Sequence, residues 1–525
     1  MKGGCIDKYF IYLSYKKKMN FLMAIGTWFG QNILTKPEFF VGLLVFVGYL
    51  FLGKKIYEAV GGFIKATVGY MILNVGAGGL VTTFRPILAA LKTKFQLNAA
   101  VIDPYFGLQA VDEAIKGMIE LDPSKKSLAA SVMMALLIGF IVNIVLVLFR
   151  KITKVRTLFI TGHIMQQQAS TASWMIFFLF PQFRNIWGIV LIGLFSGVYW
   201  AVGSNLSVEP TQRLTENAGF AIGHQQMFAI WAVDKLAPKI GNPKKRLDDM
   251  KLPKWLTMLH DDIISTGLIM IIFFGVIMLV LGPEFFTAKF GKCTIANGVQ
   301  TCLVKNPNGV ATGAFDPKKL SFGTYVVSTT LLFAVYLTIL KTGVRMFVSE
   351  LTLSFQGISN KILPGSLPAV DCAASYGFGS PSAVLFGFLV GTIAQFISIA
   401  GLLIFKSPVF IITGFVPVFF DNATIAVYAD KRGGARAALI LSALSGVLQV
   451  LCGAVAVALF QLKGGWHGNI DQSTVWLAQG FVMKYLGVVG YVLVIAAMLL
   501  IPQLQYMKSK NKEQHFEGTV NLEEN

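Results

Sequence analysis

The stretch FITGHIMQQQAS runs from Phe159 to Ser170 and lies between two strongly apolar runs, 128–149 and 171–181. Three consecutive glutamines and a histidine are unfavourable in such a setting, because lipid offers no partner for a buried amide or imidazole. These polar groups must therefore face other protein groups or a cavity. We expect a broken or re-entrant element here, embedded among membrane-spanning helices.

The composition places the whole chain in a membrane. Its 525 residues are 55% hydrophobic and only 14% charged, with a mean hydropathy of +0.65, whereas soluble domains are about a quarter charged. Several apolar runs exceed the ~18 residues that span a bilayer; they are 186–205, 262–282, 322–340, 382–405 and 436–460. With the less regular segments, we predict an all-α polytopic protein with about 11 spans.

The positive charge of the chain follows the loops. The formal net charge is +19, and basic residues cluster at 150–156, 235–254, 431–436 and 508–512. In a soluble protein this charge would suggest nucleic acid. Between apolar runs it indicates the positive-inside bias and anionic lipid headgroups, so we predict no nucleic-acid partner.

The ends and the longest loop are predicted to be separate segments. Residues 1–18 form a basic N-terminal extension, and 283–320 form a long polar loop on the outside. Residues 502–525 form a charged cytoplasmic tail, which we expect to be disordered. Cys293 and Cys302 share the polar loop and are either bridged or two free thiols; no metal or redox spacing is present among the five cysteines.

Three pairs of segments recur in the same order in the two halves. YLFLGKK at 49–55 matches YLTILKT at 336–342, VIDPY at 101–105 matches AVDCA at 369–373, and 158–170 matches FIITGFVPVFFDNAT at 410–424. Chance similarity among apolar segments is the alternative to an internal duplication. Duplicated transporters hold their substrate near the midplane on broken helices, and the matched segments here are the polar, interrupted ones.

Two histidines stand in the same local pattern. His163 and His224 each follow a glycine and lie beside glutamines, and His163 shares a helix face with Gln167. Imidazole and amide groups both donate and accept hydrogen bonds, which suits a small ligand rich in hydroxyl groups. The other interpretation is that these side chains only bond helices to one another.

Acidic residues in apolar surroundings are the other candidates for function. Asp371 costs roughly 2.5–3.5 kcal/mol at membrane depth, so it should face a cavity or a partner. Its repeat counterpart is Asp103, and Asp421 and Glu350 are further candidates, the last with Arg345 nearby. We find no phosphate-binding loop, catalytic triad or metal-ligand spacing, and we predict no catalytic residue, cofactor or metal.

Longer motifs carry a family resemblance. TGHIMQQQA, PTQRLTENAGFAIGHQQMFA, GVRMFVSEL, GISNKILPG, AVDCAA and FFDNATIAVYAD resemble the ascorbate-specific enzyme IIC of the bacterial phosphoenolpyruvate sugar phosphotransferase system. The resemblance covers about residues 19–500. It implies a cell-membrane homodimer whose protomers each have a core domain for substrate and a dimerisation domain. It also implies two inverted repeats, about 19–185 and 262–501, joined by a linking region at about 186–258.

The resemblance further implies a function and a set of contacts. The family carries L-ascorbate inward, and a separate cytoplasmic IIB protein, recharged by IIA, phosphorylates it from a phosphocysteine. The implied substrate-binding residues are Pro104, Tyr105, His163, Ile164, Met165, Gln166, Gln167, His224, Gln225 and Asp371.

Two other classes of function remain open on the sequence alone. An ion-coupled secondary transporter for ascorbate or another small polar anion or sugar would use Asp371 or Glu350 as its coupling group. A non-transporting receptor or scaffold would follow if the polar clusters only bond helices together.

Overall fold

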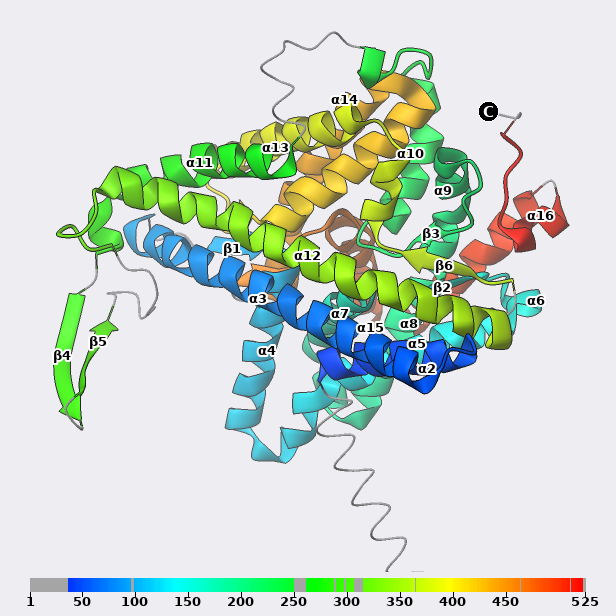
Figure 1. The fold of residues 1–525 in the computed structure, drawn as a ribbon, viewed down its shortest axis with the longest axis horizontal. Coiled ribbons are helices and arrows are strands. Elements are labelled where there is room, and N and C mark those ends of the chain that lie inside the picture. The colour runs from blue at the N-terminus through cyan, green and yellow to red at the C-terminus, as the bar shows by residue number, and fades with distance from the viewer. Residues whose placement is uncertain are drawn as a thin grey trace, which may run out of the picture.

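The computed structural model describes residues 36–95, 99–249, 261–287, 289–296, 299–305, 315–363, 365–462, 464–509 and 511–522. Within them the chain is mostly helical, with short strands between several helices (Figure 1). The expectation of an all-α fold is therefore wrong in this respect. The predicted extension at 1–18 and the first residues of the predicted first repeat, 19–35, lie outside the described residues.

The helices follow the apolar runs of the sequence. Those of the first half are α2 (Pro37–Phe51), α3 (Ile56–Phe95), α4 (Pro104–Leu121), α5 (Ser131–Leu148), α6 (Arg150–Thr153), α7 (Gly162–Leu179), α8 (Ile186–Leu206), α9 (Val208–Thr215) and α10 (Met227–Ile240). Those of the second half are α11 (Asp262–Leu281), α12 (Phe322–Ile362), α13 (Pro381–Ile404), α14 (Asn422–Phe460), α15 (Ile470–Lys508) and α16 (Lys512–Glu517).

The described helices include several that are long and apolar enough to cross a bilayer. There are five such stretches: Ser131–Leu148, Ile186–Thr215, Ser382–Ile404, Pro417–Phe460 and Ile470–Lys508. The first four overlap apolar runs that the sequence singled out, at 128–149, 186–205, 382–405 and 436–460. The prediction of a polytopic membrane protein is confirmed at this level.

Helices α2, α3, α11 and α12 pack mainly on one another. The two longest, α3 and α12, run side by side across the molecule (Figure 1). Gly69 of α3 permits their close approach, because a Cβ there would lie 2.8 Å from the backbone nitrogen of Phe347 in α12. Helices α2 and α3 come from the beginning of the first predicted repeat, and α11 and α12 come from the beginning of the second. Together they form one layer against the remaining helices.

Two small parallel sheets lie among the other helices. One has the order β7 (Phe410–Thr413), β1 (Ala99–Ile102), β8 (Gly465–Trp466), and the other has the order β2 (Thr157–Phe159), β6 (Leu367–Val370), β3 (Ala221–Ile222). In each sheet the central strand comes from one half of the chain and both flanking strands come from the other half. The stretches 158–170 and 410–424 are both interrupted, since each contains a strand followed by a helix.

The polar loop at 283–320 contains a hairpin of β4 (Lys289–Ala296) and β5 (Val299–Lys305), which projects away from the helices (Figure 1). Cys293 and Cys302 are cross-strand partners in its register. A bridge between them, one of the two alternatives that the sequence left open, stays a prediction.

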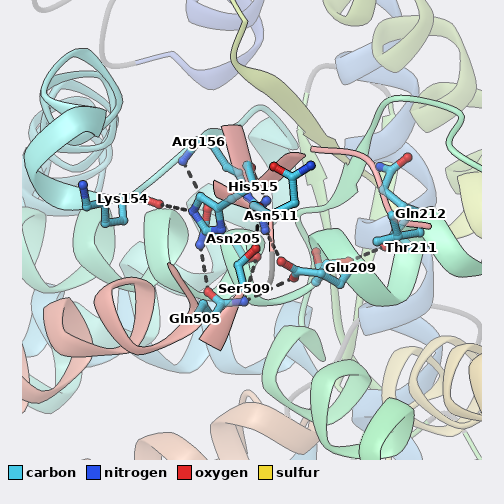
Figure 2. A network of polar contacts seen from close by, with 12 residues as sticks. Lys154, Arg156, Asn205, Glu209, Thr211, Gln212, Gln505, Ser509, Asn511 and His515 are labelled. Atoms are coloured by element: carbon cyan, nitrogen blue, oxygen red, sulfur yellow. Dashed lines mark hydrogen bonds and ion pairs between the residues drawn. The ribbon is translucent and has the colours of Figure 1, made fainter. Parts of the chain in front are cut away.

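The tail after Pro502 is ordered over the described residues 503–509 and 511–522, so the prediction of disorder is wrong for these residues. Helix α15 continues to Lys508, and α16 docks with His515 buried. The buried Arg156 pairs with Glu209 and donates to the carbonyl oxygen of His515 (Figure 2). The Nζ atom of Lys154 lies 4.2 Å from the centroid of the Tyr506 ring. Composition alone could not reveal these long-range contacts.

We expect docking of the tail to depend on pH. Burial and the neighbouring Arg156 cation lower the pKa of His515 to about 4, below its ordinary value. A released tail would bind a proton more readily, so docking is strongest above about pH 6.5 and weakens as the pH falls towards 4. Hydrogen exchange of residues 511–522 should therefore speed up when the pH is lowered, after correction for intrinsic exchange rates.

The variant His515→Gln is the control, because glutamine can still donate to the Lys154 carbonyl that faces His515 Nε2 but does not titrate. Its tail should exchange at a rate that does not change between about pH 7.5 and pH 5. Equal pH dependence in both proteins would contradict the role of His515.

Candidate functional site

One sheet edge brings together three candidate residues that are far apart in sequence. Strands β2, β6 and β3 are parallel, so the segments that follow them leave from the same edge. His163 lies in the first turn of α7 after β2, Asp371 follows β6, and His224 follows β3. All three side chains are buried. The Nε2 atoms of His163 and His224 lie 3.5 and 3.8 Å from the same oxygen, Asp371 Oδ2.

Both distances are longer than a hydrogen bond, which spans about 2.7–3.2 Å for N–H···O. Asp371 therefore faces two imidazoles without bonding to either. Its other oxygen, Oδ1, accepts from the backbone N–H of Ala373, at 2.9 Å, at the start of the short helix η7 (Cys372–Gly377). The carboxylate is held by one oxygen and presents the other to the site.

Three other buried carboxylates differ from Asp371, because none of them has an oxygen without a hydrogen-bond partner. Asp103 caps α4 and accepts from the backbone N–H groups of Tyr105 and Val416. Asp421 accepts from Asn469 and the backbone of Ile470, and Asp471 accepts from Tyr199 and the first turn of α10. Each of these three has both oxygens bonded within the protein. Among the four, judged on the described residues, Asp371 alone keeps an oxygen for something else.

The ring of His224 is held in place by Gln226, on the side away from Asp371. Its Nδ1 lies 2.7 Å from Oε1 of Gln226, whose Nε2 donates to Thr424 at 2.9 Å. With the amide in this orientation, Nδ1 carries the proton and the neutral ring presents Nε2 as an acceptor. Nε2 then faces the Asp371 carboxylate, which is also an acceptor. Two acceptors that face each other suit a ligand that donates hydroxyl protons to them.

The glutamines form a chain of amide hydrogen bonds. Trp200 donates to Gln168, Gln168 donates to Gln225, and Gln225 donates to Gln167, at 2.7, 2.8 and 2.8 Å. Gln225 thus has both amide atoms engaged by protein, as expected for a side chain that bonds elements together. The chain ends at Gln167, whose side chain interacts with the phenol of Tyr105, and Tyr105 in turn lies within electrostatic reach of Asp371.

The remaining sequence candidates have distinct surroundings. Pro104 and Tyr105 begin α4 at the end of β1, so they reach the site from the other sheet. Ile164 and Met165 are buried in the apolar core. Gln166 accepts a hydrogen bond from Tyr70 of α3.

Glu350 lies apart from this cluster. It accepts from Tyr49 and forms an ion pair with Lys65 at 3.4 Å. The described partners of this acid are thus Tyr49 and Lys65. The side chain of Arg345, which the sequence had suggested as a partner, lies outside the described residues. The two described partners give Glu350 a structural role within the layer of α2, α3 and α12.

Sequence reasoning missed three residues around the site. His467 follows β8, and its Nδ1 lies 2.7 Å from Thr171 Oγ1, one helical turn beyond Gln167. Phe347 of α12 lies edge-on to the His163 ring, with centroids 5.6 Å apart, and Tyr70 packs on Phe347. The site therefore lies where α7 meets the α3–α12 layer. His467 stood out only as a histidine next to glycine, and the two aromatic residues resembled ordinary helix-packing residues.

The donor set also has the composition of a metal site. The ligand atoms of His163, His224 and Asp371 all lie within 4.8 Å of one another, and two imidazoles with one carboxylate can hold zinc or another divalent ion. The same three groups can bind a hydroxylated organic anion. The two possibilities are separable by experiment.

Comparison with known proteins agrees with the sequence resemblance. The family described as PTS system sugar-specific permease component, EIIC-GAT, matches residues 32–480. A relative from Mycoplasma pneumoniae, named Ascorbate-specific PTS system EIIC component, is 34% identical over 453 residues, which is 82% of this chain and 66% of the relative. The chain thus spans just under two thirds of that relative's length. Because the match extends over most of the sequence, this chain belongs to the family of sugar-specific permease components of the phosphotransferase system.

Proposed function

We propose that this protein is the membrane component of a phosphotransferase system that binds L-ascorbate outside the cell and carries it inward. A separate IIB protein, recharged by IIA, would phosphorylate the substrate from a phosphocysteine. Family membership supports the class of reaction, and the name of the Mycoplasma pneumoniae relative supports the substrate.

One observation carries the proposal most directly. Asp371 Oδ2 faces the Nε2 atoms of His163 and His224 at 3.5 and 3.8 Å, and this oxygen has no hydrogen-bond partner among the described residues. Ascorbate has side-chain hydroxyls that can donate to the carboxylate and to His224. Its ring oxygens can accept from Tyr105, Gln167 or a ring N–H of His163. Since amide and imidazole groups outnumber fixed charges, the site suits a small, polar, singly charged ligand.

The reciprocal sheets support the duplication behind this mechanism. β1 of the first half lies between two strands of the second, and β6 of the second half lies between two strands of the first. Asp103 and Asp371 follow the two central strands, as the VIDPY and AVDCA match predicts. We assign the sheets and the helices around them to the core domain, and α2, α3, α11 and α12 to the dimerisation domain.

Two features of the α3–α12 layer support movement and dimerisation. The site lies between this layer and α7, so sliding of the core past the layer would expose the substrate to alternate sides. Tyr57, Val60, Ile64, Val68 and Val75 form an exposed apolar stripe on α3, suited to a second copy of the chain.

Uptake of radiolabelled L-ascorbate into proteoliposomes, with and without phosphorylated IIB inside, tests the function. The proposal predicts that ascorbate phosphate accumulates inside only with IIB present. Accumulation of unmodified ascorbate driven by an ion gradient would instead identify a secondary transporter. No uptake in either case, from protein shown to be folded, would refute ascorbate as the substrate.

The variant Asp371→Asn should bind L-ascorbate roughly 10- to 100-fold more weakly, because a hydrogen bond to a charged acceptor contributes about 1.5–3 kcal/mol. The substituted asparagine can still accept from the Ala373 backbone, so the melting temperature should change little. The matched control is Asp421→Asn, whose two oxygens both serve α15. It should lower the melting temperature and leave affinity intact. Equal affinities for both variants would contradict the assignment.

Chelation should leave the site functional. If His163, His224 and Asp371 bind ascorbate directly, affinity after exhaustive treatment with EDTA should stay within about twofold of its starting value. Added zinc should compete with ascorbate, since both use the same donors. A loss of affinity on chelation, reversed by one metal ion, would show that the site works through that ion.

A further inference from the structure

One face of the protein, where α10 ends and α14 bends, carries exposed positive charge on a rigid support. We call Lys235, Lys239, Lys244, Lys245 and Arg436 the basic platform; all five are exposed. Lys239, Lys244, Lys245 and Arg436 form no ion pair with any residue that the structure describes. The nearby acids are already used within the protein.

Those acids neutralise the inner basic residues. The buried Asp234 pairs with Arg213, with Nε to Oδ1 at 2.9 Å, and with Arg432 at 3.2 Å. The buried Asp430 pairs with Arg246 at 2.9 Å. Asp234 and Asp430 point inward.

Asp248 and Asp249, in the loop that carries Arg246, are exposed; Asp248 Oδ1 accepts from Ser380, and Asp249 Oδ2 accepts from the backbone N–H of Arg246. The five cations of the platform outnumber these two carboxylates, so this face remains positive.

The loop that carries Lys244 and Lys245 is fixed to α14. Asp430 Oδ1 also accepts from the backbone N–H of Leu247, at 2.9 Å, and Leu247 is buried. Ala435 N–H donates to the Lys245 carbonyl at 2.7 Å. At the bend, Gly434 has φ +68° and no room for a Cβ, since one would collide with the carbonyl oxygens of Asn242 and Lys245. A glycine is required there, and the loop occupies the resulting space.

Helices α10 and α14 connect the basic platform to the ligand site. Thr424 of α14 holds Gln226, which orients His224, and Asp430 braces the basic loop six residues later. Six residues of α-helix span roughly 9 Å. Helix α10 also starts directly after Gln226 and ends at the platform. The 14 residues of α10 span roughly 21 Å, so the platform and the ligand site lie at opposite ends of this one helix.

We propose that the basic platform is the docking surface for the phosphorylated soluble protein that modifies the substrate. This inference rests on the proposed function. The donor must bring a doubly charged phosphoryl group to the cytoplasmic side of the membrane, which is where the positive-inside bias places the basic residues at 235–254. Exposed cations steer such a partner and hold it. Attraction of lipid headgroups needs no fixed geometry, whereas this loop is fixed by several contacts to the core, as a protein interface requires.

The test uses the full chain in nanodiscs, with purified phosphorylated IIB as the probe. The double charge reversal Lys239→Glu with Lys244→Glu should slow association of IIB roughly 10- to 100-fold and reduce its salt dependence. L-ascorbate affinity should be unchanged. The control is Lys318→Glu with Lys406→Glu, which reverses two exposed lysines elsewhere and should leave IIB binding as it is in the unaltered protein.

Each other outcome is decisive. If the platform variant binds IIB as the unaltered protein does, the platform is not the docking surface. If it binds IIB normally but loses affinity for anionic lipid, the platform is a lipid contact and the inference is overturned. If the unaltered protein binds ascorbate but never IIB, the proposed function fails, and this inference fails with it.

Discussion

Backbone that leaves a helix within a membrane must still find hydrogen-bond partners, and this constraint organises the centre of the protein. The chain meets it by pairing short strands in two parallel sheets, each built from both halves of the sequence. Because parallel strands release their following segments at one edge, His163, His224 and Asp371 are forced together. The strand pairing that gives the non-helical backbone its hydrogen bonds thus also sets the positions of the three side chains that form the site.

Four buried carboxylates share a second device, since each accepts a backbone N–H group at the start of a helix, where the partial positive charge favours an anion. Asp103 and Asp471 accept backbone N–H groups with both oxygens, and Asp421 accepts one with Oδ2 while its Oδ1 accepts from the Asn469 side chain, which makes all three structural. Asp371 uses one oxygen and turns the other towards two imidazoles. The same capping interaction thus stabilises the fold at three carboxylates, whereas at Asp371 it leaves one oxygen free to bind a ligand.

The sequence predicted what depends on local pattern. Length and apolarity were enough to place α5, α8 and α13, and the polar residues of the site stood out because apolar neighbours make them expensive. The strands were missed because β3 has two residues and β2 has three, too few for an alternating pattern. The docked tail was missed as well, because its charged composition concealed long-range contacts with Arg156 and Asn217.

An experimental density map of the protein with bound L-ascorbate would test the central claim most directly. The account predicts one ascorbate molecule between His163, His224 and Asp371, with Asp371 Oδ2 accepting a ligand hydroxyl and Phe347 bordering the site from α12. Density for ascorbate elsewhere, or an ion on the three donors with ascorbate bound only through it, would contradict the account.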